Sequence, residues 1–141
     1  EIPEYGTEAG RYKVPIMFYT PDGTLKKRLE GTMQQIDIMP TILGLLDYDL
    51  PYIAFGNDLT DTPSEKSFAV GCNNGVFHLF KDGYLLMFDG ENPVALYSYA
   101  TDRMLEDNLL GKVDCENNLL LLKSVIQQYM ERMTAADGLS L

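Results

Sequence analysis

The pattern of apolar and polar residues changes along this chain, from helical spacing in some segments to strand-like runs in others, and these changes divide the chain into elements. Between residues 38 and 46, apolar side chains return every three or four positions, which places them on one face of an α-helix. Asp37 can cap the helix N-terminus, and Pro40 falls in the first turn, where no internal amide donor is needed. The segment 47–51 ends the pattern. We predict a helix over 38–46 whose apolar stripe faces a core.

The residues before this helix predict one strand and a loop. Residues 1–11 are polar and without periodicity, which is typical of a lead-in loop. Residues 14–19 form an apolar run typical of a strand buried on both faces, with Pro15 at its beginning. Residues 21–23 form a turn, and 25–31 an exposed connection with a basic triplet at 26–28. That triplet could contact an anionic head group or be a solvated charge cluster.

The second half of the chain predicts an antiparallel meander and a helix. Strands are expected over 68–73, 76–81, 84–88 and 94–99. Asn74-Gly75 and Asp82-Gly83 are two-residue hairpin signals. Asp114 can cap a final helix, and residues 135–141 fray. The apolar stripe expected on that helix consists of Leu119, Leu122, Val125, Ile126, Tyr129, Met130 and Met133.

The strand at 84–88 has no polar face, so both of its sides should be covered. We expect the final helix to cover one side, and the helix at 38–46 or a portion outside this chain to cover the other. A boundary near Pro63 divides the chain into residues 1–62, a strand-helix portion, and 63–141, the antiparallel subdomain with its helix.

Composition limits the classes of partner. With 141 residues, 45% of them hydrophobic, the chain can bury one core. The net charge is −10 and is spread evenly, which argues against a nucleic-acid partner. Cys72 and Cys115 could pair, but two cysteines define no disulfide framework, and free, buried thiols are the better interpretation. No apolar run reaches the length of a spanning helix, so the segment itself should be soluble.

Four segments in order resemble signatures of the sulfatase family within the alkaline phosphatase superfamily. The central one is the Asp-x-x-Pro-Thr pattern formed by Asp37, Pro40 and Thr41. The flanking ones are a Val-Pro aliphatic strand at 12–21, a Gly-x-x-Leu segment at 55–59, and a late Leu-Tyr and Asn-Leu signature at 95–109. Within the superfamily, the chain is most similar to membrane-anchored proteins of the lipoteichoic acid synthase type, which transfer phosphoglycerol.

The resemblance implies a fold and a function. The fold would be the C-terminal part of an alkaline phosphatase-like α/β/α domain, which is α+β in the isolated segment. The parent enzyme would act on sulfate or phosphate esters with a nucleophilic Thr, Ser or formylglycine and a divalent ion (Mn, Mg, Ca or Zn). Its nucleophile and metal ligands would precede Glu1, and the start without methionine suggests an excised piece. No catalytic, cofactor-binding or metal-ligating residue is therefore assigned in this chain.

The implied partner is the N-terminal catalytic portion of the same parent, in a membrane-anchored protein whose enzymatic part faces outward. Apolar surface left uncovered could also cause self-association. The rival hypothesis is a self-sufficient, non-enzymatic binding or interaction module. It predicts a closed core, whereas the fragment hypothesis predicts poor burial of 14–19 and 84–88, or their burial by a second copy.

Few residues are candidates for chemistry. His78 is the only histidine and has no local cluster of ligands, so a structural or exposed histidine is expected. Catalysis through it would require a phosphodiesterase activity that His78→Ala abolishes. The cap role accounts for Asp37, and Thr41 can bond back to a helix carbonyl. The acidic pairs that could hold calcium or simply be surface carboxylates are Asp47/Asp49, Asp58/Asp61 and Asp89/Glu91.

Overall fold

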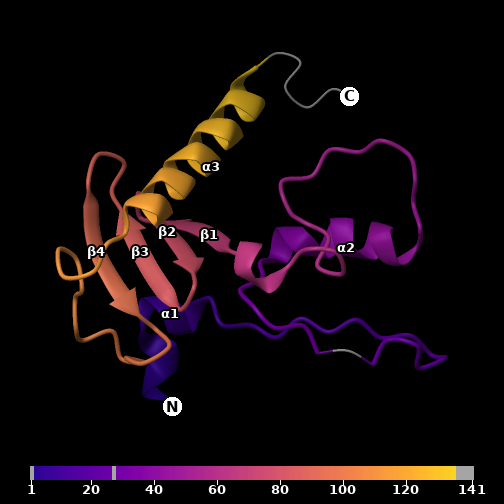
Figure 1. The fold of residues 1–141 in the computed structure, drawn as a ribbon, viewed down its shortest axis with the longest axis horizontal. Helices are drawn as coiled ribbons and strands as arrows, with labels where there is room; N and C mark the ends of the chain where they lie inside the picture. Colours follow the sequence, from indigo (N-terminus) through magenta and orange to yellow (C-terminus); the bar gives the residue numbers. More distant parts are fainter. Residues whose placement is uncertain (1, 27, 136–141) are drawn as a thin grey trace.

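The computed structural model describes residues 2–26 and 28–135 and contains one antiparallel sheet (Figure 1). Its strands are β1 (Ala69–Asn73), β2 (Val76–Lys81), β3 (Tyr84–Phe88) and β4 (Pro93–Ser98), in the order β1-β2-β3-β4. The hairpin residues Asn74 and Gly75 have φ values of 51° and 79°, and Asp82 and Gly83 have 52° and 80°. Both central residues of each turn are therefore left-handed, as a tight two-residue hairpin requires. The predicted meander is confirmed.

One face of the sheet is covered by the long helix α3 (Glu116–Thr134). Leu122 is fully buried and belongs to a core whose other buried members are Leu79, Leu86, Phe88 and Leu96. Asp114 Oδ1 accepts the Glu116 amide at 2.9 Å, so this carboxylate stabilises the helix start while Cys115 occupies the cap position. Residues 136–141, where fraying was expected, lie outside the described residues.

The predicted apolar stripe of α3 is only half correct. Its first half packs on the sheet, but Tyr129, Met130 and Met133 are 47%, 53% and 49% exposed. Figure 1 shows the reason, because α3 extends well beyond the sheet that its first turns cover. The distal apolar residues therefore have no sheet beneath them.

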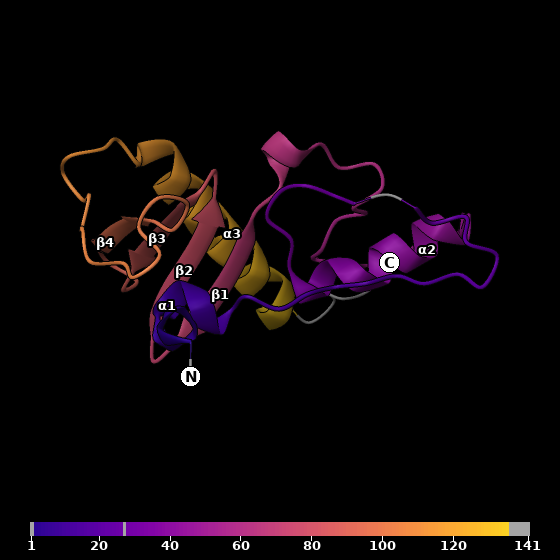
Figure 2. The same cartoon turned by 90° about the horizontal axis from the view of Figure 1, so that it is seen from below.

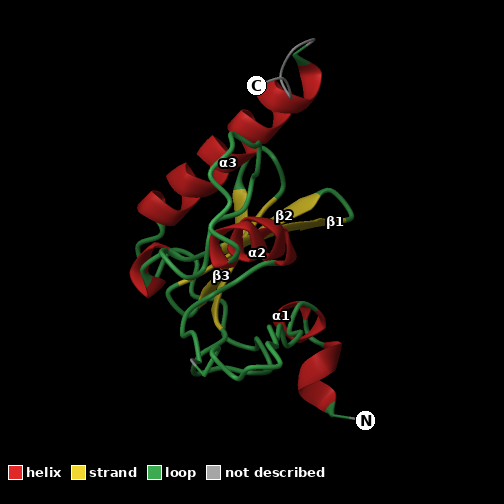
Figure 3. Cartoon of the chain, turned by 90° about the vertical axis from the view of Figure 1, so that its right-hand side faces the viewer, coloured by secondary structure: helices red, strands yellow, loops and turns green. Residues whose placement is uncertain are grey.

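The opposite face of the sheet is covered by the N-terminus, which the sequence did not indicate. In place of the expected loop, a 3₁₀ turn (Pro3–Gly6) and the single-turn helix α1 (Glu8–Arg11) form, and Thr7 Oγ1 accepts the Gly10 amide at 3.0 Å. Figure 3 shows α1 and α3 on opposite sides of the sheet. Of the two covers suggested for this face, the helix at 38–46 or a portion outside this chain, the helix is not found there, since the N-terminal turns occupy the face.

The helix α2 (Ile38–Leu45) forms where it was predicted and follows a 3₁₀ turn (Gln35–Asp37). It ends before Asp47, whose φ is +50°. It lies beside the sheet rather than over it (Figure 2). The prediction that its apolar stripe faces a core was therefore wrong: Ile42 and Leu46 are 41% and 71% exposed, and its buried residues are Pro40 and Thr41.

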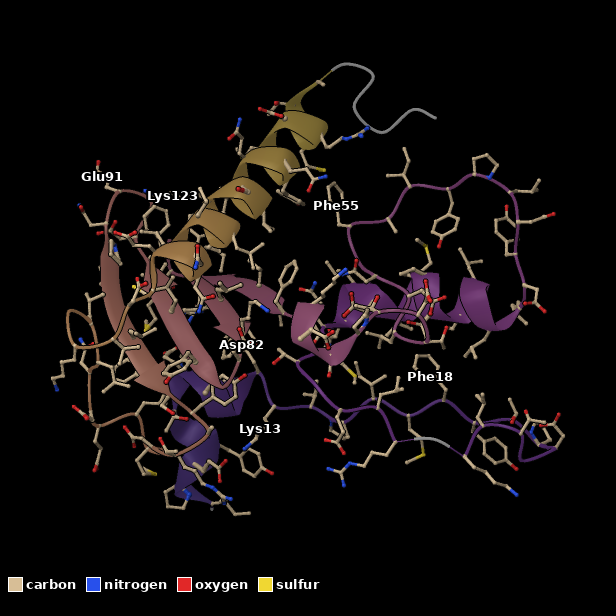
Figure 4. The ribbon with its side chains drawn as sticks, viewed as in Figure 1. Lys13, Phe18, Phe55, Asp82, Glu91 and Lys123 are labelled. Atoms are coloured by element: carbon tan, nitrogen blue, oxygen red, sulfur yellow. The ribbon has the colours of Figure 1, made fainter. Side chains whose placement is uncertain are left out.

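Residues 14–19 are extended but form no strand among the described residues, so the prediction of a doubly buried strand was wrong. Met17 and Tyr19 are 87% and 81% exposed, while Ile16 and Phe18 are half-buried. Phe18 lies between this segment and α2 (Figure 4). The segment thus has one partly covered face and no neighbouring strand to pair with. The turn after it is confirmed, with the Gly23 amide bonded to the Thr20 carbonyl at 3.0 Å.

Candidate functional site: a buried junction of two motifs

The most densely bonded part of residues 14–62 is the junction between the start of α2 and the segment 56–59. Asp37 is 2% exposed and accepts two backbone amides, from Gln34 at 2.9 Å and from Asn57 at 2.8 Å. The expected cap of the first turn of α2 was wrong. Asp37 has helical φ and ψ of −76° and −14° and ends the 3₁₀ turn, so its carboxylate reaches the preceding turn and the 56–59 segment instead.

Thr41 makes the second link of the junction. Its hydroxyl donates to the Asp37 carbonyl at 2.6 Å, which confirms the predicted back-bond. The same oxygen accepts the Leu59 amide at 3.0 Å, a contact that the sequence did not indicate. Thr41 is 1% exposed, so both interactions are shielded from water. The hydroxyl therefore gives the buried Leu59 amide an acceptor that it would otherwise lack.

Two glycines allow the two segments to approach closely. A Cβ on Gly56 would overlap the carbonyl oxygen of Ile36, and a Cβ on Gly44 would overlap the carboxylate of Asp58. At Gly56 any other residue would force the two backbones apart, whereas at Gly44 the Asp58 side chain would have to move. The glycine of the Gly-x-x-Leu segment is thus required by its contact with the residue before Asp37, which sequence spacing alone does not show.

This arrangement is suited to holding backbone segments in place rather than to reacting with a substrate. Each oxygen of the Asp37 carboxylate has a backbone donor, and the Thr41 hydroxyl is used as donor and acceptor. A nucleophile or general base must reach a substrate, and both residues are buried, Asp37 at 2% and Thr41 at 1% exposed. The structure therefore joins two of the four sequence segments, the Asp-x-x-Pro-Thr pattern and the Gly-x-x-Leu segment, by buried hydrogen bonds that hold the backbone in place.

The histidine is placed elsewhere, on the sheet face covered by the N-terminus. His78 is 1% exposed, and its Nδ1 lies 3.3 Å from the Tyr12 hydroxyl. Its Nε2 is buried without a hydrogen-bond partner in the described part of the chain. Burial lowers the pKa of His78, while the charge of Glu8 acts in the opposite direction. Of the two interpretations left open by the sequence, the structural histidine is the one observed.

Two carboxylates of the acidic pairs, Asp58 and Asp89, accept hydrogen bonds within turns. Asp58 Oδ1 accepts the amide and the hydroxyl of Thr60 at 2.8 and 2.7 Å. Asp89 Oδ1 accepts the amides of Glu91 and Asn92, each at 2.8 Å, and these bonds lower the pKa of Asp89. Across residues 2–26 and 28–135, no three His, Cys, Asp or Glu side chains gather as metal ligands would.

Both cysteines are free thiols, as expected, but the prediction that they are buried holds poorly. Cys72 is exposed because it is on the short outer strand β1, and Cys115 is half-buried at the start of α3. Burial raises the pKa of Cys115, and the neighbouring carboxylates of Asp114 and Glu116 raise it further.

Two adjoining grooves lie between the N-terminal residues, the segment 29–36 and the sheet. Their volumes are about 240 and 500 Å³, and residues that line both include Tyr12, Val14, Met33 and Phe80. They are mainly apolar and open to solvent. No sequence pattern indicates these grooves, because they depend on where the N-terminal turns cross the sheet.

No protein-family model, curated protein or solved structure that was compared with this chain matches it. Membership of the sulfatase family therefore stays a prediction. Within the described part of the chain, no helix combines the length and the apolar character needed to cross a membrane.

Proposed function

We propose that this chain is the non-catalytic C-terminal segment of a metal-dependent enzyme of the alkaline phosphatase superfamily, where it serves as a scaffold beside the active-site cleft. The observation that carries the proposal is the junction of Asp37 and Thr41 with residues 56–59. Two segments selected for their resemblance to the family are also those that the structure joins by buried hydrogen bonds. A shared structural role would explain why both patterns occur in one chain in this order.

Exposed apolar surface on residues 14–55 supports a contact with the N-terminal catalytic portion of the parent enzyme. A solvent-facing helix normally presents polar residues, yet α2 exposes its apolar stripe. The large apolar residues exposed in this region are Val14, Met17, Tyr19, Leu25, Ile36, Met39, Ile42, Leu45, Leu46, Tyr48, Leu50, Tyr52 and Phe55. In this proposal, the N-terminal catalytic portion of the parent covers them.

The chemistry would then belong to the parent protein. That protein would cleave or transfer a sulfate, phosphoglycerol or phosphoethanolamine ester with a bound divalent ion, and it would be anchored in the membrane with its enzymatic part outside. The ion would activate a nucleophile and stabilise charge on the transferred group. The segment described here would contribute the junction and the sheet that support one wall of the cleft.

The test compares the complete reading frame with this chain. The codons before Glu1 should encode an Asp-His pair within a few positions and several apolar spans much earlier. The full protein should hydrolyse p-nitrophenyl sulfate or bis-p-nitrophenyl phosphate in the presence of Mn²⁺ and lose this activity in EDTA, while the 141-residue chain stays inactive. A frame without the pair, or hydrolysis by the chain alone, would overturn the proposal.

A matched pair of variants tests the scaffold role in the full protein. Gly56→Ala should reduce the metal-dependent activity, because the added methyl overlaps the Ile36 carbonyl and separates the junction. Gly6→Ala is the control, since a Cβ there meets open space. Equal activity of the two variants would show that the junction does not support the site.

One observation favours the rival, a self-sufficient binding or interaction module. The strand β3 is covered by this chain alone, with Leu85 and Leu86 both 0% exposed, whereas the fragment hypothesis predicts poor burial there. The poor burial of residues 14–19 points the other way. Sedimentation of the purified chain distinguishes the two: a module stays monomeric, and a detached scaffold self-associates through its exposed apolar surface.

A further inference from the structure

The N-terminal strap, defined as residues 3–13, packs one aromatic side chain, Tyr12, against the sheet. The Tyr12 ring lies 5.7 Å from the His78 ring and 5.3 Å from the Phe80 ring, centroid to centroid. The space for it exists because residue 71 is glycine: a Cβ there would come within 3.0 Å of the Tyr12 ring. The Tyr12 hydroxyl shares a hydrogen bond with His78 Nδ1 at 3.3 Å.

Burial of His78 beneath the strap favours the neutral imidazole over the charged one, and the carboxylate of Glu8 acts in the opposite direction. His78 Nε2 is buried and has no partner in the described chain, and the same holds for Glu8 Oε2 on the strap. When Tyr12 donates to Nδ1, the neutral imidazole already carries its N–H on Nε2, so protonation makes Nδ1 a second donor and adds a positive charge to a side chain that is 1% exposed. The register partners of His78 on the neighbouring strands, Gly71 and Met87, cannot ionise. The ionisable groups facing His78 are therefore Tyr12 and Glu8, both from the strap.

We propose that the contact between Tyr12 and His78 is a pH-sensitive latch. Protonation of His78 releases the strap and uncovers the sheet face around Gly71 and Phe80, while the sheet and α3 remain folded. The strap can detach without unfolding the sheet, because α3 covers the opposite face and the core around Leu122 contains no strap residue. This inference is independent of the function proposed above.

The direction of the pH effect follows from the burial of His78. Burial holds its pKa below 6.5 in the closed state, with Glu8 opposing in part, whereas release of the strap returns the pKa toward 6.5. The stability of the closed state is therefore complete above pH 6.5 and declines as the pH falls below it. At pH 5.5, one unit below the open-state pKa, the equilibrium constant for closing the strap is therefore lowered at most about elevenfold.

The strap carboxylate of Glu4 titrates at lower pH than His78. Glu4 pairs with Lys13 and with Arg103, the latter at 3.6 Å. The hydrogen bond from Lys13 lowers the pKa of Glu4 below 4.5, so this carboxylate stays ionised while His78 gains its proton. Between pH 6.5 and 5.0, protonation of Glu4 therefore does not contribute to release of the strap.

Amide hydrogen exchange of the whole chain tests the latch. The amides of Arg11, Tyr12 and Lys13 donate to Thr7, Ala9 and Gly10 carbonyls at 3.1, 3.3 and 3.2 Å and report closure. After correction for intrinsic exchange, their protection should fall up to about tenfold from pH 7.5 to 5.5, while the protection of β2 and β3 amides stays constant. Unchanged strap protection, or an equal loss in the strands, would overturn the proposal.

Variants distinguish protonation of His78 from other causes of strap release. His78→Gln keeps an acceptor for Tyr12 but cannot titrate, so its strap protection should not depend on pH; a loss equal to that of the unsubstituted protein would contradict the latch. Gly71→Ala should open the strap at pH 7.5 by lifting Tyr12, and Gly6→Ala, with open space at its Cβ, should not. An NMR titration of the His78 ring in the unsubstituted chain gives a check that needs no variant: its midpoint must lie below 6.5.

Discussion

The sheet with α3 and the region of residues 14–62 are ordered by different forces. In the sheet unit, the buried side chains are mainly apolar, and Leu79, Leu86 and Leu122 are 0% exposed. In residues 14–62, the buried set is Asp37, Pro40, Thr41 and Leu59, and large apolar side chains face solvent. One region is stabilised by burial of apolar area and the other by hydrogen bonds and close glycine contacts at a single junction.

This difference predicts an uneven distribution of stability. Burial of apolar surface contributes about 25 cal/mol per Å², so the core beneath α3 should dominate the free energy of unfolding. Hydrogen bonds contribute less per group, and regions with few buried apolar contacts open locally at lower cost. We therefore expect residues 14–62 to open before the sheet does.

The largest expected effect is in the core. Leu122→Ala should lower the free energy of unfolding by about 2–5 kcal/mol, because it leaves a cavity among the core residues of the sheet. Urea unfolding followed by circular dichroism measures the change. Leu120→Ala, two residues away on the same helix and 66% exposed, should change it by less than about 0.5 kcal/mol. Equal losses would show that α3 does not pack as described.

The next effect belongs to the junction. Thr41→Val keeps the side-chain shape but leaves the buried Leu59 amide without an acceptor, which should cost about 1–3 kcal/mol. The loss should be confined to residues 14–62, seen as faster exchange of the Leu59 and Asn57 amides with unchanged exchange in β3. Thr60→Val is the control, since Thr60 is exposed and its own amide bond to Asp58 persists. Faster exchange throughout the sheet would contradict the separation of the two regions.

The sequence predicted local structure well where a short pattern decides it. The strands β2 and β3 have the predicted bounds, because Asn74-Gly75 and Asp82-Gly83 dictate tight turns whatever surrounds them. The start of α2 was also predicted, since Pro40 and the apolar period depend only on neighbours in the chain. These signals act within a few residues and need no tertiary partner.

The errors concern which faces are covered. The apolar stripe of α2 and the run 14–19 predict burial, but burial depends on what lies opposite, and within the described chain nothing covers Met17 or Leu46. The coverage of the sheet by Tyr12 depends on the missing side chain of Gly71, over 50 residues away in sequence, and no periodicity contains it. The bond between Thr41 and Leu59 was missed for the same reason.

The smallest expected effect concerns the contact between the two regions. Phe55 extends from the loop after α2 toward α3 (Figure 4), and its ring lies 5.2 Å from that of Tyr129. Both side chains are partly exposed, at 38% and 47%, so a double-mutant cycle of Phe55→Leu and Tyr129→Leu should give a coupling energy of about 0.5–1 kcal/mol. Tyr48 and Tyr52, whose rings are 6.2 Å apart within one region, give the matched cycle. A coupling energy well above 1 kcal/mol in the Phe55 cycle would show that the two regions are one cooperative unit, because an exposed ring pair alone cannot supply that energy. A coupling energy within error of zero would show that the two regions unfold independently.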